Sequence, residues 1–255
     1  MIYLDYNATT PIAAEVAEAM KPFLLEEFGN PSSAHPMGKR PKEALERARG
    51  RISALLGCEG NEIIFTSGGT ESNNMVLKSM AWTMRNRGRH IITTRIEHPA
   101  ILNTALFLME TGLDVTFLPV DKYGQVDPDE VKRAIRKDTI LITVMHANNE
   151  TGTIQLLADI SSIAREYGIL FHTDAAQAVG KIETKVDDLG VDFLTIAGHK
   201  LYAPKGVGAL YVRRGVAIEP FMHGGGQEMG LRSGTENVML NVGLGMACEL
   251  VQGDL

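Results

Sequence analysis

Short runs of consecutive apolar residues alternate with longer stretches in which apolar residues recur every three or four positions, from about residue 62 to residue 212. The short runs, rich in Ile, Val and Phe, predict strands buried on both faces, and the periodic stretches predict helices. Strands are predicted at residues 63–66, 90–96, 115–120, 140–145, 169–173, 193–196 and 209–212, and helices between most of them at residues 71–87, 99–111, 128–135 and 157–167. This alternation predicts an α/β fold in which helices cover both faces of one mostly parallel sheet of about seven strands.

The last two predicted strands are joined by a short loop that contains Pro and Gly and has no helical pattern. A parallel pair needs a long crossover connection, so these two strands are predicted to be antiparallel and the sheet to be mixed. Further helices are predicted at residues 13–25, after Pro11, at residues 39–56 and from residue 238 onward.

The composition is that of a globular protein, with 44% hydrophobic and 22% charged residues among 255. This length allows one large domain, or one domain and a fragment of another. The net charge of −6 does not suggest a nucleic-acid partner. No apolar run is long enough to span a membrane and the N-terminal residues do not form a secretion signal, so a cytoplasmic location is expected. Two cysteines, Cys58 and Cys248, make no disulfide framework, which suits a reducing compartment.

Polar and glycine-containing motifs directly follow several of the predicted strands. Ligands of open α/β sheets collect outside the carboxyl ends of the strands, so these motifs predict a binding site. In TSGGTESN, residues 66–73, a strand leads into Gly68 and Gly69 and a helix starts near Thr70, and the N–H groups of such a helix start suit a phosphate. No Gly-Lys-Ser/Thr sequence follows, so this is not a Walker motif. His98 follows the next predicted strand, where its ring could stack on a planar ligand or exchange protons.

Three further residues at strand ends have useful chemistry. Asn149 follows the strand at 140–145 and could hydrogen-bond a hydroxyl or a carboxylate. Asp174 ends a buried strand, where a carboxylate needs a cationic partner, and a protonated pyridine nitrogen would serve. Lys200 follows the strand at 193–196, where desolvation lowers the pKa of an amine and favours the neutral form that condenses with an aldehyde.

Each motif also has a plainer interpretation. The glycine turn is compatible with an ordinary helix start, His98 with a structural histidine and Asn149 with turn chemistry. Asp174 is compatible with a salt bridge to another part of the chain, and Lys200 with an ordinary loop lysine. Together, however, the motifs supply a phosphate turn, a ring stacker, a hydroxyl partner, a carboxylate for a ring nitrogen and a lysine. This combination predicts pyridoxal 5′-phosphate as the cofactor.

The chain resembles the cysteine desulfurases of the class V aminotransferase family, which are fold type I pyridoxal-phosphate enzymes, over nearly its whole length. The motifs that carry the resemblance are LDYNATTP (4–11), GNPSS (29–33), FTSGGTESNN (65–74), EHP (97–99), NNETG (148–152), HTDAAQAVGK (172–181), GHK (198–200), PKGVG (204–208), GGGQE (224–228) and RSGT (232–235). The resemblance implies the large-domain architecture of fold type I.

The resemblance also implies catalytic and ring-binding roles. Lys200 would form the Schiff base with the cofactor and shuttle protons, and His98 would stack on the ring and act as an acid–base group. Asp174 would pair with the pyridinium nitrogen. Gln177 and Asn149 would bind the ring oxygen. In such enzymes the cofactor is the electron sink, and the protein orients it.

Phosphate binding is implied for a second group of residues. Gly69, Thr70 and His199 would hold the phosphate, and Thr235 would complete the phosphate site of a partner subunit, so a homodimer is expected. The chain departs from many relatives at Ala197, two positions before His199, where they have a serine near the phosphate. One phosphate hydrogen bond would therefore be missing or supplied by another group.

The implied reaction converts L-cysteine to L-alanine and passes the sulfur to an enzyme cysteine as a persulfide, from which a sulfur-acceptor or iron–sulfur scaffold protein would take it. The implied domains are an N-terminal segment of the small domain at residues 1–12 and a cofactor-binding large domain at residues 13–255, with the C-terminal small domain absent. That part of the family supplies the sulfur-accepting cysteine and a substrate-binding arginine. Cys58 and Cys248 do not match this cysteine, so both are predicted to be structural.

Three alternatives remain at this stage. A metal hydrolase could use His98, His172, Asp174 and His199, but these residues lie on separate strand ends, and a metal site would leave Lys200 unexplained. A second alternative is a non-catalytic module for cofactor binding or dimerisation. The third is a selenocysteine lyase or another member of the class V aminotransferase family.

Overall fold

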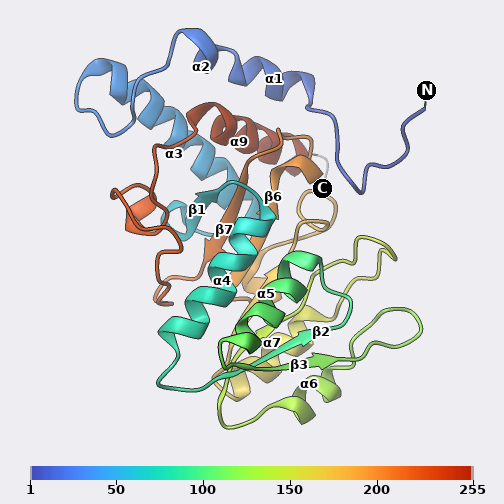
Figure 1. Cartoon of the computed structure of the whole chain (residues 1–255). Helices are drawn as coiled ribbons and strands as arrows, with labels where there is room; N and C mark the ends of the chain where they lie inside the picture. Colours follow the sequence, from blue (N-terminus) through green and yellow to red (C-terminus); the bar gives the residue numbers. More distant parts are fainter. Residues whose placement is uncertain (1, 254–255) are drawn as a thin grey trace.

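A mixed sheet of seven strands forms the centre of the computed structural model, which describes residues 2–253 (Figure 1). Residue 1 of the predicted small-domain segment and residues 254 and 255 of the predicted large domain lie outside the described residues. The strands are β1 (Ile63–Thr66), β2 (His90–Thr94), β3 (Asp114–Leu118), β4 (Thr139–Thr143), β5 (Leu170–Asp174), β6 (Phe193–Ala197) and β7 (Gly208–Val212). Their order in the sheet is β1-β7-β6-β5-β4-β2-β3, which confirms the predicted number of strands.

The antiparallel strand in this sheet is β7. It pairs antiparallel with β1 and with β6, and the β6–β7 register runs from Phe193 opposite Val212 to Ala197 opposite Gly208. Strands β2 to β6 are parallel to their neighbours within this group. The prediction that the last two strands form an antiparallel pair is therefore confirmed, and the carboxyl ends of β2 to β6 share one edge of the sheet.

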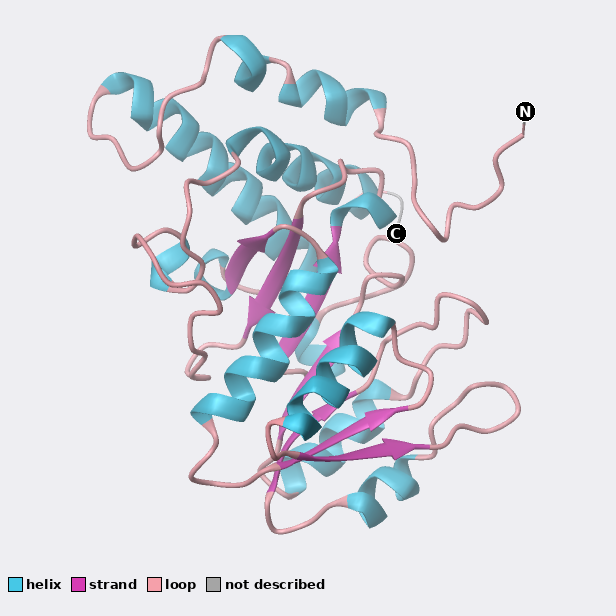
Figure 2. Ribbon diagram, in the orientation of Figure 1, coloured by secondary structure: helices cyan, strands magenta, loops and turns pink. Residues whose placement is uncertain are grey.

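Helices cover both faces of the sheet, as predicted (Figure 2). They are α1 (Ala14–Met20), α2 (Pro22–Leu25), α3 (Pro36–Leu56), α4 (Gly69–Thr83), α5 (Pro99–Glu110), α6 (Pro128–Ala134), α7 (Leu157–Glu166), α8 (Val186–Leu189) and α9 (Val238–Gln252). Successive strand residues point to opposite faces. Thus Ile64, Ile91 and Leu141 pack in one core with α4 and α5, whereas Phe65, Ile92 and Ile142 pack in the other with α3, α6, α7 and α9.

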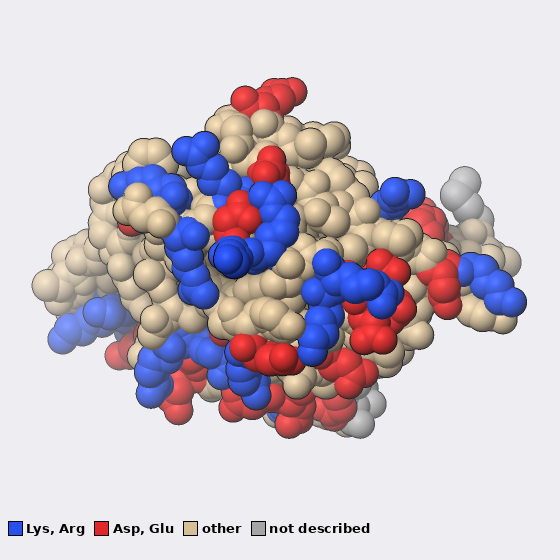
Figure 3. Space-filling view, turned by 90° about the horizontal axis from the view of Figure 1, so that it is seen from below, with Lys and Arg blue, Asp and Glu red and all other residues tan. Residues whose placement is uncertain are grey.

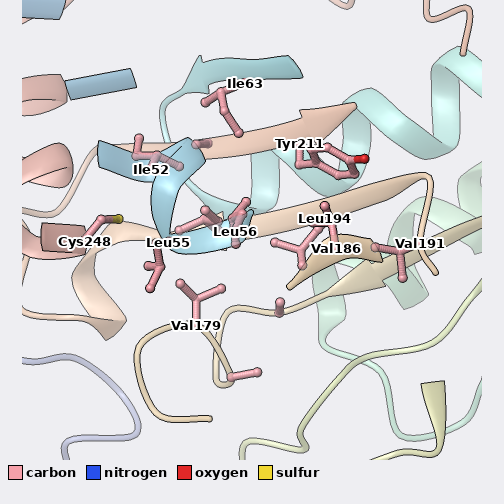
Figure 4. Packing of buried hydrophobic residues seen from close by; sticks show 14 of the residues in the cluster. Ile52, Leu55, Leu56, Ile63, Val179, Val186, Val191, Leu194, Tyr211 and Cys248 are labelled. Carbon is pink, nitrogen blue, oxygen red and sulfur yellow. The ribbon is translucent and has the colours of Figure 1, made fainter. Parts of the chain in front are cut away.

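The core beneath α3 and α9 is the larger of the two (Figure 4). Figure 4 shows Ile52 and Leu56 of α3 and Tyr211 of β7 within it, together with Cys248 of α9. Cys248 is fully buried and Cys58, just after α3, is half-buried, in agreement with the structural role predicted for both.

The structure corrects several predicted element boundaries. The predicted helix at 13–25 is two helices, because Pro22 lacks the N–H that would continue α1 and instead begins α2. The helix predicted from about residue 39 begins at Pro36, a residue suited to the first helical turn. Strands β2, β3 and β4 each end two residues before the predicted strands do. Beyond β4 these two residues, Val144 and Met145, are buried in a loop, whereas those beyond β2 and β3 are exposed or half-buried.

Within residues 2–253, no helix combines the length and apolar character needed to cross a membrane. Basic and acidic residues are intermixed on the face seen in Figure 3. Ion pairs such as Arg136 with Asp114 and Asp138, at 2.7 and 2.9 Å, occur among the exposed residues of the chain.

Candidate active site

A pocket of about 410 Å³ lies where the loops after β2, β4, β5 and β6 meet the first turn of α4. Eight of the nine predicted site residues line it: Gly69, Thr70, His98, Asn149, Asp174, Gln177, His199 and Lys200. Thr235 does not line this pocket and is exposed in the segment between β7 and α9. The parallel strands bring the eight residues together because their carboxyl ends share one edge of the sheet.

The turn between β1 and α4 forms one wall of the pocket. Gly68 has a φ of 148°, a conformation that favours glycine. A Cβ atom on Gly208 would lie 2.7 Å from the Gly68 Cα, so glycine at 208 allows β7 to approach the turn. Among residues 2–253, no side chain caps the start of α4, and the N–H groups of its first turn, at Gly69 and Thr70, therefore suit an anion at the positive end of the helix dipole.

Asp174 ends β5 and is only 5% exposed. One carboxylate oxygen, Oδ1, accepts a hydrogen bond from the Ala176 N–H at 3.0 Å, and Oδ2 accepts one from Asn73 Nδ2 at 2.7 Å. Burial raises the pKa of Asp174, while these hydrogen bonds and the positive charges of His98 and Lys200 act in the opposite direction. The pocket thus contains a buried carboxylate that no Lys, Arg or His among residues 2–253 pairs with directly.

Lys200 ends the 3-10 helix η2 (Gly198–Lys200) directly after β6. Its Nζ donates hydrogen bonds to the carbonyl oxygens of Asn7 and Ala8, the second at 3.1 Å. Burial lowers the pKa of Lys200, although the negative charge of Asp174 opposes the shift. A lowered pKa increases the neutral fraction of the amine, which is its nucleophilic form.

His98 is the N-cap of α5. Its Nδ1 accepts a hydrogen bond from the Ala100 N–H at 3.1 Å, so in the neutral ring the proton is on Nε2. The cap fixes one edge of the ring while the residue remains exposed in the pocket. His98 therefore combines a fixed ring orientation with a nitrogen that can donate a proton.

Gln177 and Asn149 present side-chain amides to the pocket. Gln177 Oε1 accepts a hydrogen bond from Lys181 Nζ at 2.7 Å, which leaves Nε2 as the pocket-facing donor, and in this structure Nε2 donates to Asn7 O at 3.0 Å. Asn149 Nδ2 donates to Glu150 Oε1 at 2.6 Å, and its backbone carbonyl accepts from Asn7 Nδ2 at 2.9 Å. Both amides can donate to an oxygen of a bound ligand.

The N-terminal segment contributes three pocket residues that were not predicted, Asp5, Asn7 and Ala8. Thr10 holds the segment in place, because its N–H and its Oγ1 both donate to the His199 carbonyl, at 2.9 and 3.0 Å. The only signal in the sequence was the motif at residues 4–11.

Asn73 is a further pocket residue that was not predicted. It belongs to the TSGGTESN motif, and its position one turn after Gly69 and Thr70 places it on the same face of α4. That spacing was the signal that could have identified it. Its contact with Asp174 requires the folded structure, because the two residues are 101 positions apart.

The arrangement does not favour a metal centre. Among residues 2–253, no three His, Cys, Asp or Glu side chains are grouped as metal ligands would be. His172 does not line the pocket and is fully buried, with its ring nitrogens 2.8 and 3.1 Å from the hydroxyls of Thr143 and Thr195. Burial lowers its pKa to about 3, so it is a neutral structural histidine.

The segment that carries Thr235 is tied to the rest of the chain by two ion pairs. Arg49 binds Glu228 with nitrogen–oxygen distances of 2.8 and 2.9 Å, and both residues are buried. Arg232 Nε donates to Glu71 Oε1 at 2.8 Å, beside the first turn of α4. Thr235 is therefore exposed just after two anchored positions, Glu228 and Arg232.

The residues of the pocket fit pyridoxal phosphate. The buried carboxylate of Asp174 lacks the cation that a pyridinium nitrogen would provide, and the uncapped start of α4 provides donors for a phosphate. Lys200 has a lowered pKa, as required of an amine that reacts with an aldehyde.

Comparisons with known proteins identify the family of this chain. Residues 2–254 match the family described as aminotransferase class-V. A protein named cysteine desulfurase IscS from Dictyoglomus turgidum is 57% identical over 249 residues, which cover 98% of this chain and 63% of that protein. A protein with the same name from Methanosarcina thermophila is 53% identical over 254 residues, covering 100% of this chain and 63% of that protein. The chain thus spans about 63% of the length of these two relatives.

Solved structures show the same fold. A NifS-like protein superposes with a TM-score of 0.97 at 45% identity, covering 99% of this chain and 70% of that chain. A structure described as SspA in complex with cysteine superposes with a TM-score of 0.95 at 47% identity, covering 98% of this chain and 72% of that chain. These likenesses and the seven-stranded sheet confirm the predicted fold type I architecture. Since the family match covers nearly all of the sequence, the chain belongs to the aminotransferase class-V family.

Proposed function

We propose that this chain is the cofactor-binding part of a pyridoxal-phosphate-dependent cysteine desulfurase. The observation that supports the proposal most strongly is the buried carboxylate of Asp174, which shares one pocket with Lys200 and with the uncapped start of α4. The two relatives named cysteine desulfurase and the neighbour solved with cysteine support L-cysteine as the substrate.

In this proposal the first turn of α4, with Gly69 and Thr70, holds the phosphate together with His199. Asp174 holds a proton on the ring nitrogen. Gln177 Nε2 and the side-chain amide of Asn149 donate to the ring oxygen. The bound cofactor supplies an electron sink for electrons released from the substrate.

Lys200 and His98 move protons in the proposed reaction. Burial lowers the pKa of Lys200, which increases the neutral fraction of its Nζ, the form that can accept a proton from the substrate and return it. His98, held at Nδ1 by the Ala100 N–H, offers the proton on Nε2 as a general acid. The carbonyls of Asn7 and Ala8 that now bind Lys200 Nζ would have to release it.

The sulfur atom needs a thiol acceptor, and we propose that neither cysteine of this chain serves. Burial raises the pKa of Cys248 to about 12, and burial with nearby carboxylates does the same for Cys58. Neither residue lines the pocket. A sulfur-accepting thiol must be accessible and partly ionised, so it belongs to another part of the protein. A sulfur-acceptor or iron–sulfur scaffold protein would then take the sulfur.

Thr235 supports a homodimer as part of the proposal, because it is exposed and anchored but outside the pocket of its own chain. It would complete the phosphate site of the partner subunit. Residues 1–12 would belong to a small domain and residues 13–255 to the large domain, with the N-terminal segment reaching into the pocket through Asp5, Asn7 and Ala8.

Cofactor titration followed by absorbance tests the binding part of the proposal in this chain. Alanine and sulfide released from L-cysteine test the reaction in a protein that also contains the sulfur-accepting thiol. Binding should saturate at one cofactor per chain. Asp174→Asn should slow the reaction much more than it weakens binding, because it removes the charge that keeps the ring nitrogen protonated. A reconstituted Asp174→Asn protein that reacts at the wild-type rate would show that this role is wrong.

A further inference from the structure

Asn73 is a buried amide whose two ends have different surroundings. Its residue is 1% exposed and lies in α4, one turn after the start of the helix. The Nδ2 group donates to Asp174 Oδ2 at 2.7 Å, whereas Oδ1 is buried and has no hydrogen-bond partner among the described residues. Reversing the amide would place Oδ1 against the carboxylate oxygen, so this orientation follows from the contact.

A buried amide oxygen without a partner destabilises a protein, so this side chain is not explained by its contribution to stability. Among the side chains that the structure describes, only Asn73 donates a hydrogen bond to Asp174. The other donor is the backbone N–H of Ala176, at 3.0 Å. His98 and Lys200 affect the pKa of Asp174 through their charges rather than through hydrogen bonds. The charge of Asp174 in turn contributes to the raised pKa of the buried Glu97 carboxyl.

We propose that Asn73 is a positioning residue for the cofactor ring: its Nδ2 orients the Asp174 carboxylate and stabilises its charge, so that Asp174 keeps the ring nitrogen protonated. The inference rests on the proposed function, because it assumes that Asp174 faces the ring nitrogen. The two hydrogen bonds from Asn73 and Ala176 fix both oxygens of the carboxylate and leave the remaining lone pairs for the ring N–H.

The test uses pyridoxal phosphate labelled with ¹⁵N in the ring, because the nitrogen chemical shift reports its protonation directly. Asn73→Leu replaces the amide with an apolar side chain of similar size and removes the unpartnered oxygen as well. The wild-type protein should show a pyridinium nitrogen, and the variant should show a resonance shifted toward neutral pyridine while it still binds the cofactor.

Ser72→Ala is the matched control. Ser72 precedes Asn73 in α4 and is fully buried, and its Oγ lies 2.8 Å from Thr66 Oγ1. The control therefore removes a buried polar contact between α4 and the sheet without touching Asp174. Its nitrogen resonance should stay in the pyridinium range. If Asn73→Leu does not fold, Asn73→Ala tests the same loss of the donor.

A second readout compares pyridoxal phosphate with 1-deazapyridoxal phosphate, which lacks the ring nitrogen. The wild-type protein should prefer pyridoxal phosphate, and Asn73→Leu should reduce this preference about tenfold or more, because a hydrogen bond to a charged group is lost and Asp174 becomes neutral more easily. If Asn73→Leu and Asn73→Ala both keep the wild-type preference for pyridoxal phosphate and the wild-type ¹⁵N shift, the inference is overturned. If the wild-type protein binds no pyridoxal phosphate, the proposed function itself is wrong.

Discussion

Replacing Arg49 with methionine should destabilise the protein by about 3–5 kcal/mol, because it leaves the Glu228 carboxylate buried without its counter-charge. Arg49 is 8% exposed and Glu228 is 6% exposed. The same carboxylate also accepts a hydrogen bond from the Phe65 N–H at 2.8 Å. The pair therefore joins α3, β1 and the segment that carries Thr235.

The expected loss follows from the geometry of the pair. At 2.8 Å and an effective dielectric constant of about 20, the attraction between the charges is about 6 kcal/mol. The cost of burying both charges offsets part of this attraction while the pair is intact. Burial alone lowers the pKa of Arg49, but the hydrogen bond and charge of Glu228 outweigh it and raise the pKa. Arg49→Met also removes the donor to the Ile63 carbonyl, at 2.6 Å, while retaining an apolar side chain over the Phe65 ring.

Urea unfolding followed by far-ultraviolet circular dichroism measures the loss. Arg133→Met is the control, because it breaks an exposed ion pair with Glu130 and should cost much less stability than Arg49→Met. The double variant Arg49→Met/Glu228→Gln should be about 1–3 kcal/mol more stable than the sum of the single losses, since it leaves no unpaired charge. If Arg49→Met costs no more than the Arg133→Met control, the account of the buried pair is refuted.

Borohydride reduction of the protein with pyridoxal phosphate should fix the cofactor to Lys200, because burial lowers the pKa of that amine; a label on Lys181 instead would contradict the assignment. Native Cys58 and Cys248 should resist iodoacetamide at pH 8 and react fully in urea, because burial raises both pKa values to about 12, and rapid labelling of either thiol in the native protein would be evidence against this. Glu97→Gln should gain stability relative to the wild type as the pH rises from 5 to 8, because burial raises the pKa of Glu97 from 4.5 to about 8. In that window the Glu97 carboxyl has lost its proton in the unfolded protein and retains it in the folded protein, so wild-type stability falls as the pH rises. Urea midpoints that change equally with pH in the two proteins would disprove this.

Apolar periodicity predicted all seven strands but misplaced several boundaries. Val144 and Met145 lie beyond the end of β4 but are only 0% and 3% exposed. They were predicted as strand residues because burial in a loop and burial in a strand produce the same apolar pattern. Periodicity likewise did not locate the break between α1 and α2 at Pro22. The four-residue helix α8 (Val186–Leu189) was not predicted, because four residues are too few to establish a helical period.

Six pocket residues were predicted because residue type and position at a strand end are local properties of the sequence, and parallel strands bring such ends together: Gly69, Thr70, His98, Asn149, Asp174 and Lys200. Gln177 and His199 were predicted from the family resemblance alone. The contacts that adjust the chemistry of those residues were not predictable in this way. Asn73 meets Asp174 across 101 positions, and Lys200 meets Asn7 across 193. Such contacts depend on how distant segments pack, and so do the lowered pKa of Lys200 and the burial of Cys248, because desolvation is set by all the atoms around a group rather than by its neighbours in the chain.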